Sequence, residues 1–233
     1  MSATVGVIQF PGTNCELDVE RAVQHLGGAT ERLWHADANL RGVDAVVVPG
    51  GFAHGDYLRT GAIARFSPVM DAIAGFAAAG GPVVGICNGF QVLTESHLLP
   101  GALMRNAALK FVCRDVHLRV ERSDTPFTRG YNAGQVIRVP VAHGEGNYVA
   151  DAQTIARLEG EGRVLFRYTA PDGGLDPQWN HNGATNAIAG ILNEAGNVLG
   201  MMPHPENHVE AAMGCTDGRG LFAGLADHFK QAA

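Results

Sequence analysis

The chain contains 233 residues, of which 46% are hydrophobic and 17% charged, and its formal net charge is −6. This length suits one large α/β domain and is short for two, so we expect residues 1–233 to form a single domain. The acidic balance, with lysine only at Lys110 and Lys230, argues against nucleic acid or an anionic membrane surface as a partner.

The cysteines and the N-terminus bear on the cellular compartment. The four cysteines are far apart and include no Cys-x-x-Cys pair, so we expect neither a zinc ribbon nor a disulfide framework, and we interpret Cys15, Cys113 and Cys215 as structural. No basic segment precedes the first apolar run, and the most apolar helical stretch, residues 62–79, is interrupted by charged residues and a proline. The sequence therefore predicts a cytoplasmic protein without a signal peptide or a membrane span.

The first part of the chain alternates short apolar runs with helical patterns. We expect strands at Thr4–Phe10, Thr30–Trp34, Ala45–Val48 and Pro82–Ile86, helices at Glu16–Leu26 and Pro68–Ala79, and further helical sequence from Leu58. Strands that are apolar throughout and alternate with helices are typical of parallel βαβ units. The pattern predicts an α/β fold with a doubly wound, mostly parallel sheet, in which ligands bind at the carboxyl ends of the strands.

After Gly101 the pattern changes. Residues 116–120 alternate between apolar and polar side chains, as in a strand with one face toward water. The remaining expected elements are strands at Val136–Val141, Val164–Tyr168, Asn186–Leu192 and Val198–Met202 and helices at Ala150–Leu158 and Gly220–Gln231. We therefore expect an added antiparallel strand region, and no linker marks a second domain.

One cysteine stands where a buried strand turns directly into a helix. The sequence Gly85-Ile86-Cys87-Asn88-Gly89 has glycine two residues before and two residues after the cysteine. This is the spacing of a nucleophile elbow, in which a tight turn leaves no room for neighbouring Cβ atoms and presents the side chain at a helix N-terminus. The same pattern also fits a buried structural cysteine next to a glycine loop. On its own, the pattern leaves both interpretations of Cys87 open.

A cysteine nucleophile needs a base, and the base needs an orienting acceptor. Three histidines precede a carboxylate by two residues, in His54-Gly55-Asp56, His143-Gly144-Glu145 and His204-Pro205-Glu206. Pro205 restricts the backbone of the third pair, whereas glycine leaves the other two loose. We therefore favour His204 and Glu206 over His143 and Glu145 as the catalytic pair.

Cofactor signatures are absent from the sequence. No helical His-x-x-x-His pair or other compact ligand set indicates a metal site. The chain also lacks the glycine-rich phosphate-binding patterns that ATP and dinucleotide sites use. We expect no metal and no cofactor in this chain.

With Cys87, His204 and Glu206 in place, the sequence resembles the class I (triad) glutamine amidotransferases. Within that family it is similar to the glutaminase subunits of phosphoribosylformylglycinamidine synthases, and the similarity covers nearly the whole chain. The segments that carry the resemblance are 10–15, 49–52, 55–59, 61–68, 85–91, 142–146 and 201–206. The resemblance implies a flavodoxin-like amidotransferase fold.

The resemblance also implies roles for individual residues. Cys87 would be the nucleophile, His204 the general base and acid, and Glu206 the residue that orients His204. Backbone N–H groups of Gly51 and Asn88 would form the oxyanion hole. The implied substrate-binding residues are Gln91 and His143.

The resemblance implies hydrolysis of glutamine, with ammonia passed to a partner. The partner would be an ATP-dependent synthetase, working with a small bridging subunit, that converts formylglycinamide ribonucleotide to formylglycinamidine ribonucleotide in purine biosynthesis. ATP and Mg²⁺ are then expected on the synthetase. The alternatives are another cysteine hydrolase of the same fold, of the stress-protein or peptidase type, and a non-catalytic scaffold subunit. The intact Cys87, His204 and Glu206 argue against the scaffold.

Overall fold

The computed structural model describes residues 3–232, with side chains described up to Leu225 in the last helix. A nine-stranded sheet with the order β2-β1-β3-β4-β11-β10-β9-β6-β7 forms the centre of this part of the chain, and β5 and β8 form a second, two-stranded sheet. The strands are β1 (Thr4–Gln9), β2 (Ala29–Trp34), β3 (Ala45–Val48), β4 (Val83–Ile86), β5 (Ala102–Met104), β6 (Val112–Val120), β7 (Val136–His143), β8 (Asn147–Val149), β9 (Val164–Thr169), β10 (Ile188–Leu192) and β11 (Val198–Met201). The helices are α1 (Glu16–His25), α2 (Pro68–Ala78), α3 (Asn88–Glu95), α4 (Ala152–Gly160) and α5 (Arg219–Ala232).

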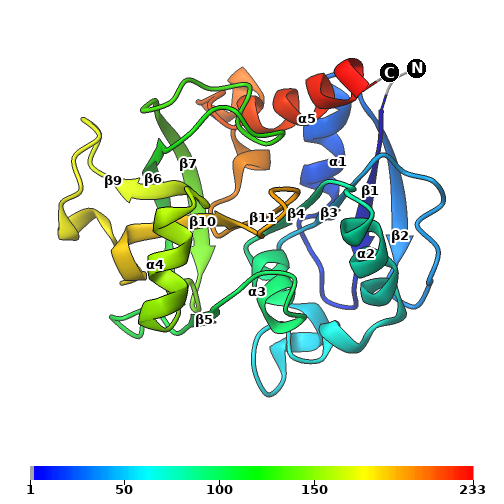
Figure 1. Cartoon of the computed structure of the whole chain (residues 1–233), viewed down its shortest axis with the longest axis horizontal. Coiled ribbons are helices and arrows are strands. Elements are labelled where there is room, and N and C mark those ends of the chain that lie inside the picture. Colours follow the sequence, from blue (N-terminus) through cyan, green and yellow to red (C-terminus); the bar gives the residue numbers. More distant parts are fainter. Residues whose placement is uncertain (1–2, 233) are drawn as a thin grey trace.

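The sheet has a parallel half and an antiparallel half. Strands β2, β1, β3, β4 and β11 pair in parallel, whereas β10, β9, β6 and β7 pair antiparallel. Helices α1 and α5 cover one face of the parallel half, and α2 and α3 cover the other (Figure 1). The predicted doubly wound, mostly parallel sheet with an added antiparallel region is confirmed.

Local sequence explains why these elements form. Strands β3, β4 and β11 are buried along their whole length, which suits apolar runs covered by helices on both faces. Pro68 occupies the first turn of α2, where a missing N–H costs nothing. The Asp151 side chain caps α4 by accepting a hydrogen bond from the Thr154 N–H at 2.9 Å.

The structure differs from the sequence-based expectation in three segments. The expected helical sequence from Leu58 is wrong, because turns and short 3₁₀ helices at Ala53–Asp56 and Ala64–Phe66 lead up to α2. The expected strand from Asn186 begins two residues later, since Thr185–Ala187 forms a 3₁₀ turn with Asn186 at φ 51°. The small sheet of β5 and β8 was not predicted.

The fold brings four chain segments to one edge. The carboxyl ends of the neighbouring parallel strands β1, β3, β4 and β11 lie at the same edge of the sheet, as parallel strands require. The segments that follow these strands carry Cys15, Gly51, Cys87 and His204. None of the helices in the described residues is long and apolar enough to cross a membrane.

Candidate active site

Cys87 occupies the turn between β4 and α3. It caps α3 with φ 51° and ψ −107°, and its side chain is buried. A Cβ atom on Gly89 would lie 1.9 Å from the carbonyl oxygen of Val48, so only glycine allows the helix to approach β3 this closely. The predicted elbow is therefore present, with its thiol at the N-terminus of α3.

His204 and Glu206 form a buried pair next to the elbow. Nδ1 of His204 lies 2.6 Å from Oε1 of Glu206, and the two residues are 4% and 0% exposed. The His204 N–H donates to the carbonyl of Pro140 at 2.8 Å, and Pro205 begins a 3₁₀ turn that holds the pair. Nε2 of His204 is buried and has no hydrogen-bond partner among the described residues.

The other two histidine–carboxylate pairs have different partners. His54 lies 3.4 Å from Oγ of Ser67 through its Nε2, and His143 contacts Asn106 through its Nδ1 at 3.1 Å. Of the three pairs, His204 and Glu206 are the one whose two members are hydrogen-bonded to each other, and their catalytic role stays a prediction.

The surroundings of His204 favour its charged form. Burial alone would lower the pKa of His204, but the Glu206 carboxylate and the nearby thiols of Cys87 and Cys15 outweigh it and raise the pKa well above the usual value. An imidazole with a raised pKa accepts a proton readily, and it can return that proton to a neighbouring thiol.

Asn88, directly after the thiol, ties the elbow to the loop that follows β3. Its Oδ1 accepts a hydrogen bond from the Ala53 N–H at 2.9 Å, and its Nδ2 donates to Asp56 at 3.0 Å and to Gln91 at 2.9 Å. Gly51 precedes this loop with φ 148°, and a Cβ there would lie 2.7 Å from Cα of Thr13. The two residues expected to form the oxyanion hole are thus joined through a hydrogen-bonded loop.

A cavity of about 200 Å³ opens beside Cys87. The residues that line it are Gly51, Phe52, Asp56, Thr60, Cys87, Gln91, Phe111, Ala142, His143, Gly144 and Glu145. Of the predicted site residues, Gly51, Cys87, Gln91 and His143 therefore share one cavity. Asp56 and Thr60 were not predicted to line it, because the loop after β3 meets the segment after β7 only in the folded chain.

Cys15 also lies at the site, although we interpreted it as structural. Its Sγ, a ring nitrogen of His204 and a carboxylate oxygen of Glu206 lie within 4.8 Å of one another, the only such cluster of potential metal ligands in the described part of the chain. The Cys15 N–H donates to the carbonyl of Gly50 at 3.2 Å. Its position after β1, beside β3, is the signal that could have indicated this proximity.

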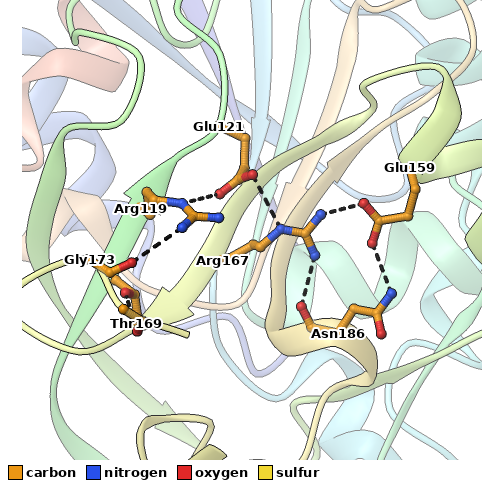
Figure 2. A network of polar contacts seen from close by, with 8 residues as sticks. Arg119, Glu121, Glu159, Arg167, Thr169, Gly173 and Asn186 are labelled. Atoms are coloured by element: carbon orange, nitrogen blue, oxygen red, sulfur yellow. Dashed lines mark hydrogen bonds and ion pairs between the residues drawn. The ribbon is translucent and has the colours of Figure 1, made fainter. Parts of the chain in front are cut away.

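A larger hollow of about 530 Å³ lies near β9 and α4, and its charged side chains bind one another (Figure 2). The guanidinium of Arg167 contacts Glu121 at 3.3 Å, the carbonyl of Asn186 at 2.8 Å, and Glu159. Its lining contains no cysteine, serine or threonine, so the chemistry of the side chains, and not the size of the hollow, favours the cavity beside Cys87 as the site.

Comparisons with known proteins agree with this geometry. The sequence model of the CobB/CobQ-like glutamine amidotransferase domain matches residues 2–215. The subunit PurQ of phosphoribosylformylglycinamidine synthase from Bradyrhizobium diazoefficiens is 68% identical over 229 residues, which cover 97% of this chain and 98% of the relative. The corresponding subunit from Moorella thermoacetica is 54% identical over 227 residues, which cover 97% of this chain and 96% of the relative.

Solved structures show the same fold. A chain in the structure of PurLQS from Thermotoga maritima has a TM-score of 0.88 at 39% identity, and the match covers 98% of this chain and 100% of that chain. A glutamine amidotransferase from the same organism shares the fold with a TM-score of 0.57 at 15% identity, covering 100% of this chain and 86% of that chain. On this sequence and structural similarity, the chain belongs to the family of CobB/CobQ-like glutamine amidotransferase domains.

Proposed function

We propose that this chain is the glutaminase subunit of a phosphoribosylformylglycinamidine synthase and hydrolyses glutamine to glutamate and ammonia. The observation that carries the proposal is the buried His204–Glu206 pair, 2.6 Å apart, next to the thiol of Cys87 on its elbow. Similarity over nearly the whole chain to subunits with that name supports it. In this proposal, residues 1–233 act as one glutamine amidotransferase domain.

The chemistry follows from the positions of the three side chains. Nε2 of His204 takes the proton of the Cys87 thiol, since Nδ1 is already bound to Glu206. The thiolate adds to the carbon of the glutamine carboxamide, and the imidazolium then protonates the amide nitrogen, so that the C–N bond breaks, ammonia departs and a thioester remains. Water, deprotonated by His204, cleaves the thioester to glutamate and restores the thiol.

Residues around the thiol stabilise the negative charge and place the substrate. Backbone N–H groups of Gly51 and Asn88 would hold the oxyanion of the tetrahedral intermediates, and such a donor contributes about 2.7–4 kcal/mol to the transition state. Gln91 and His143, which line the cavity with Cys87, would contact the bound glutamine.

The ammonia would be used by other subunits. The matched structure from Thermotoga maritima is named PurLQS, and by analogy we propose that the partners of this chain are a synthetase and a small bridging subunit. The synthetase would bind ATP and Mg²⁺ and convert formylglycinamide ribonucleotide to formylglycinamidine ribonucleotide. This chain itself would need no cofactor, and it would act in the cytoplasm.

Affinity labelling tests the proposal. A glutamine-like diazoketone should form one covalent adduct on Cys87 in the complex with the synthetase and bridging subunits, detected by mass spectrometry of peptides. Cys87→Ala should abolish both the adduct and the release of glutamate from glutamine. An adduct on another residue, or none with the partners present, contradicts the assignment.

The same experiment separates the alternatives. A cysteine hydrolase of another specificity would react with general thiol reagents but not with the glutamine analogue. A non-catalytic subunit would leave synthesis from glutamine unchanged when Cys87 is replaced by alanine.

A further inference from the structure

The cavity beside Cys87 carries two carboxylates whose role the triad does not explain. We propose that Asp56 and Glu145 form the subsite that binds the α-ammonium group of the substrate glutamine. The inference rests on the proposed function, because it assumes that the carboxamide of an amino acid lies at Cys87. It adds two specificity-determining residues to that reaction.

Both acidic residues are hydrogen-bonded to the helix that begins at the nucleophile, Asp56 through its carboxylate and Glu145 through its backbone carbonyl. Asp56 accepts a hydrogen bond from Nδ2 of Asn88 at 3.0 Å, and Asn88 follows Cys87 directly. The backbone carbonyl of Glu145 accepts a hydrogen bond from Nε2 of Gln91 at 2.7 Å, one helical turn further along α3. Asp56 and Glu145 therefore have fixed positions relative to the thiol, as a subsite for the far end of a short substrate requires.

Asp56 lines the cavity at the end of a turn with unfavourable backbone geometry. His54, Gly55 and Asp56 have φ values of 54°, 73° and 53°, so three consecutive residues lie in the left-handed region. Residues other than glycine adopt this region at a cost, and such strain gathers at functional sites.

Among the described residues, no positively charged side chain forms an ion pair with the carboxylate of Asp56, although burial and the nearby Glu145 carboxylate would favour a cation there. Burial raises the pKa of Asp56 to about 6, and the negative charge of Glu145 adds to the increase, although the hydrogen bond from Asn88 opposes it. Glu145 is held by the Thr60 hydroxyl at 3.0 Å, while its nearest arginine, Arg105, is 3.7 Å away with a side chain that is 77% exposed. A cation between the two carboxylates would remove their repulsion.

His143 adds a third acceptor and fixes the chemistry of the ligand. Nδ2 of Asn106 donates to the carbonyls of Lys110 and His143, so Oδ1 of Asn106 must accept the hydrogen bond from Nδ1 of His143. Burial and the charge of His204 lower the pKa of His143 to about 4, so the ring is neutral and its Nε2 is an acceptor. This Nε2 is buried, and no described residue donates to it.

The cavity thus contains two carboxylates and a bare imidazole nitrogen, and no lysine or arginine lines it. The α-ammonium group carries a positive charge and three N–H donors, so it complements this set. Amides that lack this group should bind poorly, which makes the subsite a source of selectivity for glutamine over other primary amides.

A comparison of two substrates tests the subsite in the complex with the synthetase and bridging subunits at pH 8. Glutamine is compared with glutaramate, which has the same carboxamide but no amino group. In Asp56→Asn and Glu145→Gln we expect KM for glutamine to rise about 10- to 100-fold each, while kcat changes little. The preference of kcat/KM for glutamine over glutaramate should fall by the same factor. The control is Glu194→Gln, an exposed carboxylate in the turn between β10 and β11, which should leave both substrates unaffected.

Each result decides the matter. An equal loss with both amides shows a structural role and overturns the subsite. Reduced transfer of ammonia to the synthetase with an unchanged KM for glutamine also overturns it. If a variant does not fold, the unchanged protein still provides a test, because equal kcat/KM for glutamine and glutaramate rules the subsite out. Failure of the unchanged protein to hydrolyse glutamine at all would refute the proposed function, and the subsite with it.

Discussion

Oε1 of Glu206 lies 2.6 Å from Nδ1 of His204 at a position that solvent does not reach. Glu206→Gln should lower kcat for glutamine hydrolysis by about 100- to 10,000-fold, with little change in KM. The side-chain amide introduced at position 206 can donate a hydrogen bond to Nδ1 of His204. The imidazole proton would then sit on Nε2, the atom that must accept the thiol proton. The measurement is steady-state glutamate release by the complex with its partners.

Glu210→Gln is the matched control, because Glu210 lies shortly after Glu206 in the chain but outside the His204–Glu206 pair. The kcat of this variant should equal that of the unchanged protein. A Glu206→Gln variant with nearly full activity would show that His204 works without an oriented partner.

Asp56→Asn should make the protein more stable at pH 8 and leave it unchanged near pH 3.5. The pKa of Asp56 is raised from 3.8 to about 6, mainly by burial. Between these two pH values the folded protein therefore keeps a proton that the unfolded chain has released. The stability that this proton provides is complete below pH 3.8 and is lost as the pH rises through 6. Because the group is only partly buried, we discount the effect to about 1 kcal/mol.

The measurement is the free energy of unfolding in urea at both pH values. An equal gain at pH 3.5 and pH 8 would show that the substitution acts through packing and not through the charge of Asp56.

Cys15 should stay unmodified when Cys87 is labelled. Burial raises the pKa of the Cys15 thiol, although His204 partly opposes this, so Cys15 remains protonated at neutral pH and reacts slowly. Peptide mass spectrometry after treatment with the glutamine analogue should find the adduct on Cys87 alone. Because the Cys15 thiol lies within 4.8 Å of His204 and Glu206, Cys15→Ala should lower kcat about 3- to 10-fold, and Cys15→Ser, which keeps a hydrogen-bonding side chain, should restore most of it.

Gly89→Ala should disrupt the elbow. Its Cβ would lie 1.9 Å from the carbonyl oxygen of Val48, so α3 or β3 must shift, and we expect a loss of more than about 3 kcal/mol in the free energy of unfolding. Gly75→Ala in α2 is the matched control, since no atom lies within 4 Å of the added Cβ. That control should gain about 0.5–1 kcal/mol from helix propensity. Equal stabilities of the two variants in urea would contradict the close approach of α3 to β3.

Arg167→Leu should reduce stability but not catalysis. The substitution leaves Glu121 and Glu159 without their shared cation in a largely buried network, for which we expect a loss of about 2–4 kcal/mol. Arg122→Leu removes an arginine from an exposed pair with Asp124 and should cost less than about 1 kcal/mol. Urea unfolding measures both, and kcat should be unchanged in both. A selective loss of kcat in Arg167→Leu would connect the larger hollow to catalysis.

Strong local signals made the parallel half and the elbow predictable from the sequence. Short apolar runs such as β3 and β4 have no alternative to burial on both faces, and glycines two residues on each side of Cys87 allow few conformations other than a tight turn. Pro205 likewise restricted the geometry of His204 and Glu206 before any long-range contact was known.

The missed features depend on contacts between distant segments. The turn at His54–Asp56 is held by Asn88, more than thirty residues later, and local helix propensity around Leu58 points to a different structure. Cys15 approaches His204 only because β1 and β11 lie in the same sheet. Sequence spacing alone does not identify such neighbours, although the position of Cys15 after β1 indicates that it lies at the same edge of the sheet.

The adjacency of β4 and β11 also sets when the enzyme becomes active during its synthesis. The thiol at position 87 leaves the ribosome 117 residues (204 − 87) before the imidazole at position 204. A nascent chain that has folded its first strands would therefore hold the proposed nucleophile without the proposed base. In the proposed mechanism, catalysis begins only when β11 enters the sheet beside β4 and brings His204 to Cys87.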